Sequence, residues 1–79
     1  MRVLYFAQAR LATGRSEENF TPSHPMKAEV FWDLVTQNHP SLLPLQSSCR
    51  LAKNGSFLQP GEMLGPEDDV AILPPVSGG

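Results

Sequence analysis

The 79-residue sequence predicts an α+β fold in which a mixed β-sheet packs on one main helix. Two short apolar runs, residues 3–6 and 70–73, are rich in residue types that favour buried strands. Residues 26–38 form one long amphipathic segment, and Asn54-Gly55 marks a hairpin turn. Because the chain is short, and 41% of its residues are hydrophobic, we expect one globular domain.

The segment after the first strand is expected to be a short helix. Residues 7–13 are mostly helix formers, and Gly14 suits the left-handed position that often follows a helix. Residues 16–21 then predict a short strand, and residues 22–25, with two prolines, predict a turn.

The main helix is expected to span residues 26–38 and to bury one stripe of its surface. The stripe predicted to face the sheet consists of Val30, Phe31, Trp32, Leu34, Val35 and, at its end, Asn38. Pro40 ends the helix, because the residue before a proline avoids the helical region. A further helical turn over residues 41–45 is expected to break at Pro44.

Three strands are predicted in the second half of the chain. Residues 49–53 and 56–58 flank the Asn-Gly pair, whose two positions both take positive φ in a tight hairpin. Residues 59–66 form a loop, and residues 70–73 form the last buried strand. This element order, with one long helix, predicts a ubiquitin-like roll.

The last six residues, Pro74–Gly79, are expected to form an extended, flexible tail on a domain of residues 1–73. Two prolines stop the last strand, and six extended residues reach roughly 20 Å. The two terminal glycines make the end as slim as a peptide can be. The tail could therefore enter a narrow channel in another protein and present its carboxylate there. An inert tail is the alternative, because small residues are common at chain ends.

Composition and charge exclude several functions. A net charge of −2 with a pI near 5.5 provides no electrostatic footprint for nucleic acid or for an anionic membrane. Cys49 is the only cysteine, which excludes an internal disulfide and a Cys/His metal cage. The chain has no Ser-His-Asp set, paired catalytic carboxylates or phosphate loop. We therefore expect a co-substrate with no bound cofactor, and the absence of signal-peptide features predicts the cytoplasm.

Three stretches of the sequence resemble the MoaD-like family, the ubiquitin-like sulfur carriers that form the small subunit of molybdopterin synthase. They are residues 3–7 with Arg10 downstream, the helix containing Phe31-Trp32, and residues 69–79. The resemblance covers essentially the whole chain and is most specific in the terminal Pro-Pro-Val-Ser-Gly-Gly run. It implies a β-grasp fold and a non-catalytic, sulfur-donating role.

The family resemblance also implies a reaction sequence at Gly79. A ubiquitin-activating-like enzyme would adenylate its carboxylate with ATP, and a sulfurtransferase or other sulfur donor would convert the adenylate to a thiocarboxylate. The residues that would enter the large synthase subunit are Pro74, Pro75, Val76, Ser77 and Gly78. There, two sulfur transfers to cyclic pyranopterin monophosphate would build the dithiolene of molybdopterin. In this family two small subunits flank a large-subunit dimer as a heterotetramer.

Four residues are candidates for the contact with the large subunit. Phe6, Phe57 and Leu73 match positions of an apolar contact patch in the family, and the alternative for each is a core residue. Arg10 is a candidate for a partner contact, or for a cation that caps the short helix.

Other polar residues are expected to have ordinary roles. His24 and His39 lie in loops beside prolines, and we expect no chemistry from either. Cys49 is expected to be a small buried hydrophobe, although a sulfur relay stays open. The acidic run 67–69 is either a solvated turn, the simpler interpretation, or a contact for a basic groove of the activating enzyme.

Other functions fit the same tail. A ubiquitin-like modifier would be conjugated to lysines through Gly79, and a carrier for thiamine thiazole synthesis would use the same activation. A plain binding domain with an inert tail is the remaining alternative. The Pro74-Pro75-Val76 run favours the molybdopterin pathway, by resemblance alone.

Overall fold

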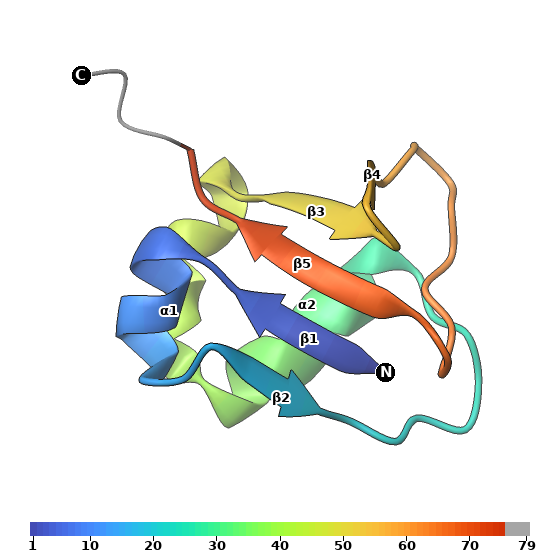
Figure 1. Ribbon diagram of the computed structural model, residues 1–79, viewed down its shortest axis with the longest axis horizontal. Coiled ribbons are helices and arrows are strands. Elements are labelled where there is room, and N and C mark those ends of the chain that lie inside the picture. The colour runs from blue at the N-terminus through green and yellow to red at the C-terminus, as the bar shows by residue number, and fades with distance from the viewer. Residues whose placement is uncertain (76–79) are drawn as a thin grey trace.

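The computed structural model describes residues 1–75, which form a five-stranded mixed sheet packed on one main helix (Figure 1). In chain order the elements are β1 (Arg2–Tyr5), α1 (Ala7–Thr13), β2 (Glu17–Asn19), α2 (Ala28–Asn38), the 3₁₀ helix η1 (Pro40–Ser48), β3 (Arg50–Lys53), β4 (Ser56–Phe57) and β5 (Asp69–Leu73). The sheet order is β2-β1-β5-β3-β4, with β1 and β5 parallel and the other pairs antiparallel. The predicted β-grasp architecture is confirmed.

The sheet has an inner face that carries the core. Five strand residues on this face are at most 8% exposed, and these are Val3, Tyr5, Leu51, Val70 and Ile72. Paired residues in register point to the same face, and Val3 lies opposite Val70 while Tyr5 lies opposite Ile72. Figure 1 shows α2 crossing behind the sheet, so the core lies between α2 and this face.

The buried side of α2 differs from the predicted stripe. The helix buries Phe31, Trp32, Val35 and Thr36, while Val30 is 52% exposed. The two aromatic side chains bury more apolar area than Val30 could, and they turn the helix toward themselves. The hydroxyl of Thr36 donates to the Trp32 carbonyl at 2.6 Å, which allows a polar residue to be buried there.

Two connecting segments contribute more to the core than predicted. Residues 40–48 form a continuous 3₁₀ helix that passes through Pro44, so the expected break is wrong. Proline's fixed φ fits this helix type, and its missing N–H removes only one hydrogen bond. In the expected loop 59–66, Leu64 is fully buried and exchanges two backbone hydrogen bonds of 2.8 Å with Met26. This pairing holds Met26 outside α2, which begins at Ala28.

The turn predictions are confirmed at the backbone level. Gly14 follows α1 with a φ of 74°, and Asn54 and Gly55 have φ values of 51° and 89°. β1 ends at Tyr5 and not at Phe6, because the chain turns at Ala7, where φ is 48°. A left-handed alanine is uncommon, and here it leaves Phe6 at the surface.

Candidate functional site

The second face of the sheet has a partly exposed apolar centre, with the charged pair Arg2 and Asp69 toward one end and Arg50 toward the other. Register aligns Leu4 with Ala71, Ala71 with Ala52, and Ala52 with Phe57 across four strands. These residues alternate with the inner-face residues, so they point away from α2. Figure 1 views the sheet from this side, where its strands are not overlaid by α2. We call this surface, which includes Phe6, Leu73 and Arg50, the open face.

The predicted tail begins at one edge of the open face. β5 is parallel to β1 and antiparallel to β3, so the ends of β1 and β5 lie beside the start of β3. Arg50 is paired with Leu73, and Tyr5 is paired with Ile72. After Leu73, Pro74 is buried and Pro75 is exposed. The predicted site residues Val76, Ser77, Gly78 and Gly79 lie outside the described residues.

Two of the predicted contact residues come together at this edge. Phe6 follows Tyr5 with an extended backbone, φ −116° and ψ 154°, so the strand alternation places it on the same face as Leu4. It is 47% exposed, and because Tyr5 pairs with Ile72, Phe6 and half-buried Leu73 are the next residues at two adjacent strand ends. Neither residue belongs to the fully buried core, so the core alternative is wrong for Phe6.

The third predicted contact residue, Phe57, lies on the edge strand β4 and is 48% exposed. The guanidinium carbon of Arg50 lies 3.8 Å from the centroid of its ring. Arg50 therefore links Phe57 to the base of the tail through a cation–π contact. Sequence reasoning missed Arg50, because an exposed arginine at the start of a strand resembles any solubilising surface charge.

Arg10 lies in the last turn of α1 and is exposed. Its backbone carbonyl accepts the N–H of Gly14 at 2.9 Å, so the backbone itself closes the helix. Within residues 1–75 its side chain forms no salt bridge. A partner contact through Arg10 stays a prediction.

The inner face contains a polar cluster that the sequence did not reveal. Glu18 Oε1 accepts a hydrogen bond of 2.8 Å from the Tyr5 hydroxyl and lies 2.7 Å from His39 Nε2. Arg15 donates to the other carboxylate oxygen at 2.9 Å. Burial acts to raise the pKa of Glu18, but the hydrogen bonds from His39 and Tyr5 and the nearby positive charge outweigh it and lower that pKa. His39 thus has a structural role.

The other candidate groups offer little chemistry. Burial raises the pKa of the half-buried Cys49 thiol, which disfavours the nucleophilic thiolate and argues against a sulfur relay there. Exposed His24 has its Nδ1 2.8 Å from the hydroxyl of the adjacent Ser23. Among residues 1–75 no three His, Cys, Asp or Glu side chains gather as a metal site. Within the same range, no helix has the length and apolar character to cross a membrane.

The acidic run has partners within the chain. Asp68 accepts from the Gly65 N–H at 2.6 Å and from the Asn54 amide at 2.9 Å. Asp69 forms a 2.9 Å ion pair with Arg2. These contacts secure the loop and the hairpin against β5, which favours the simpler of the two interpretations.

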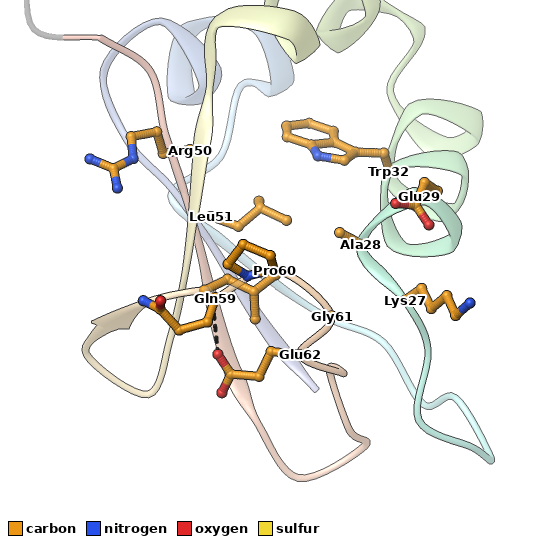
Figure 2. Close-up of a pocket in the computed structure, with 11 residues that line it drawn as sticks. Lys27, Ala28, Glu29, Trp32, Arg50, Leu51, Gln59, Pro60, Gly61 and Glu62 are labelled. Atoms are coloured by element: carbon orange, nitrogen blue, oxygen red, sulfur yellow. Dashed lines mark hydrogen bonds between the residues drawn. The ribbon is translucent and has the colours of Figure 1, made fainter.

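A cavity of about 520 Å³ lies on the other side of β3, between the start of α2 and the loop after β4 (Figure 2). Trp32 and Leu51, each 8% exposed, line it together with Pro60. Arg50 also lines the cavity, and Figure 2 shows its side chain on the side of β3 opposite to Trp32. None of the predicted contact or tail residues lines it.

Comparison with known proteins adds sequence relatives over the full length. Residues 3–79 match the ThiS family. The chain is 30% identical to the molybdopterin synthase sulfur carrier subunit of Homo sapiens, over 100% of this chain and 93% of that protein. The protein of the same name from Chlamydomonas reinhardtii is 35% identical, over 100% of this chain and 98% of that protein.

Solved structures share the fold. SAMP1 from Haloferax volcanii superposes with a TM-score of 0.83 at 23% identity, covering 100% of this chain and 98% of that one. The putative molybdopterin converting factor, subunit 1, from Pyrococcus furiosus has a TM-score of 0.77 at 24% identity and 95% coverage of both chains. This likeness establishes the β-grasp fold independently of the sequence patterns.

Proposed function

The chain belongs to the ThiS family, and we propose that it is the sulfur carrier subunit of a molybdopterin synthase. The observation that carries this conclusion is the full-length match, at 30% and 35% identity, to proteins of that name. The family match extends to Gly79, the residue that would carry the sulfur. The chain therefore acts in molybdenum cofactor biosynthesis.

The chemistry takes place at the terminal carboxylate. A carboxylate is a poor electrophile, so a ubiquitin-activating-like enzyme first transfers AMP to it from ATP and releases pyrophosphate. A sulfur donor then attacks the activated carbonyl, AMP leaves, and Gly79 ends in a thiocarboxylate. The thiocarboxylate is ionised at neutral pH, and its soft sulfur attacks cyclic pyranopterin monophosphate in the large subunit. The large subunit supplies the acid and base groups of that step.

The open face supports this proposal because exposed aromatic side chains lie on the face from which the tail begins. Phe6 and Phe57 are both nearly half exposed, and large exposed apolar groups clustered on one face are typical of contact sites. Docking this face on the large subunit would orient Leu73 and direct the residues after it into the partner's active site. Two such complexes on a large-subunit dimer make the heterotetramer, and we place it in the cytoplasm.

The reaction is tested by intact mass after incubation with the activating enzyme, ATP and sulfide. We expect one terminal oxygen to be replaced by sulfur. Deleting Gly79 should abolish both this exchange and molybdopterin formation. The urea unfolding midpoint should not change, because β5 ends at Leu73 and the deleted residue lies beyond the sheet.

Each alternative function has its own signature in this experiment. An unchanged mass, together with lysine-linked adducts in cells, would identify a protein modifier. Thiocarboxylate formation without any binding to a pterin-binding large subunit would indicate a carrier for another pathway. Molybdopterin synthesis by the chain lacking Gly79 would contradict the mechanism outright.

A further inference from the structure

We propose that Arg50 selects the partner of the open face by binding a carboxylate of the large subunit beside the base of the tail. The inference rests on the proposed function, because it assumes that the large subunit covers this face. It assigns a specificity-determining role to a residue that neither the sequence patterns nor the family resemblance singled out.

Arg50 lies at the position where a partner contact would affect the tail most. It is the register partner of Leu73, the last residue of β5. Figure 2 shows its side chain on the side of β3 that faces away from α2, the side that belongs to the open face. A partner group that binds Arg50 would therefore lie next to the point where the chain leaves the sheet.

The contact with Phe57 holds the guanidinium ready to bind an anion. Its carbon lies over the ring, 3.8 Å from the centroid, which is the distance of a cation–π contact. A guanidinium has five N–H donors, and contact with one ring leaves donors available for a bidentate bond to a carboxylate. Because the contact with Phe57 already restricts the side chain, less conformational entropy is lost when the partner binds.

Arg50 differs from several basic side chains of the chain in having no carboxylate partner within residues 1–75. Three other basic side chains have carboxylate partners at 2.9, 2.9 and 3.4 Å, and these are Arg2, Arg15 and Lys53. Arg50 forms no salt bridge within residues 1–75. Arg10 and Lys27 form none in that range either, but both lie outside the sheet, on α1 and before α2.

Docking would remove water from the Arg50 guanidinium, which costs free energy unless the partner pairs with it. When Phe6, Phe57 and Leu73 become buried against a partner, water leaves the space around Arg50 as well. A desolvated and unpaired guanidinium is strongly unfavourable, so a partner without an acidic group at this point is rejected. A partner with a carboxylate gains a hydrogen-bonded ion pair in a dry environment. The chemistry of the complementary surface is therefore apolar with one acidic side chain.

The test is calorimetric titration of the full-length chain with the large synthase subunit of the same organism, at two salt concentrations. Arg50→Met keeps an apolar contact with Phe57 but removes the charge, and we expect it to weaken binding by about 30-fold or more. Arg50→Lys keeps the charge without the planar donors, and its affinity should lie between those of the unmodified chain and Arg50→Met. Arg50→Glu should bind most weakly. Lys27→Met removes a cation outside the sheet and should leave affinity unchanged.

Salt dependence separates a specific ion pair from a general loss of structure. The affinity of Arg50→Met should depend less on salt than that of the unmodified chain, and its thermal unfolding should be nearly unchanged. Equal or tighter binding by Arg50→Met would overturn the role of Arg50 while leaving the proposed function intact. No binding by the unmodified chain would instead overturn the proposed function.

Discussion

The two faces of the sheet are built from the same strands but differ in how far their side chains are buried. Val3, Val70 and Ile72 on the inner face are fully buried under α2, whereas Phe6 and Phe57 on the open face are 47% and 48% exposed. Because side chains alternate along a strand, one residue points into the core and stabilises the fold. The next residue points outward and is available for contact with a partner. A substitution on one face should therefore alter stability, and one on the other should alter binding.

Polar groups on the two faces differ in the same way. On the inner face, the Glu18 carboxylate is surrounded by Tyr5, Arg15 and His39 from the same chain. On the open face, Arg50 has an aromatic ring but no carboxylate within residues 1–75. The charges of the inner face are paired within the chain, whereas for the open face we propose that a partner supplies the carboxylate.

The largest effect is expected in the core between α2 and the inner face of the sheet. Phe31→Ala removes a fully buried ring and leaves a cavity, which typically costs about 3–5 kcal/mol of unfolding free energy. Small domains have a thin margin, so this variant should be partly unfolded at room temperature. Urea unfolding followed by circular dichroism measures the loss. A loss below about 1 kcal/mol would mean that α2 is not held by its aromatic residues.

An intermediate effect, on binding, is expected at Phe6. Phe6→Ala should weaken binding to the large subunit by about 2 kcal/mol, or roughly 30-fold, because central aromatic residues dominate interfaces. Its unfolding free energy should fall by about 1 kcal/mol or less, since the ring is half exposed already. Titration calorimetry and urea unfolding on the same variant give both values. A stability loss as large as that of Phe31→Ala would erase the distinction between the faces.

The smallest effect is expected in the polar cluster, and it depends on pH. Glu18→Gln should cost about 1–2 kcal/mol of unfolding free energy at pH 7, because charge-assisted hydrogen bonds are lost. The pKa of Glu18 is lower in the folded chain than its ordinary value of 4.5, so its contribution is present above that pH. The contribution disappears as the pH falls through the lowered pKa.

Urea unfolding between pH 7 and pH 3 follows this contribution as the difference between the unmodified chain and Glu18→Gln. The difference should be constant at neutral pH and shrink in acid. Glu17→Gln changes the neighbouring exposed carboxylate, whose strand position pairs with Leu4 of the open face, and serves as the matched control. A difference that stayed constant down to pH 3 would show that the Glu18 charge does not stabilise the inner face.

Local sequence signals were sufficient to predict most helices, strands and turns of this protein. They also predicted the family to which it belongs. Gly14, Asn54 and Gly55 predicted their turns correctly, because positive φ is a property of a few adjacent residues. The apolar runs predicted the two parallel central strands, and the specific terminal run identified the family through Gly79. The predicted contact residues Phe6 and Phe57 are indeed exposed, because strand alternation and the turn at Ala7 place them on the open face.

Only the tertiary structure decided how these elements meet. The rotation of α2 about its axis depends on which side chains fit against the sheet. As a result Thr36 is buried in the core and Val30 is exposed. Glu18 and His39 are 21 residues apart, and Arg50 meets Phe57 across a strand pair, so neither contact has a local signature. Sequence patterns report the preferences of neighbouring residues, whereas burial and charge pairing depend on groups that only folding brings together.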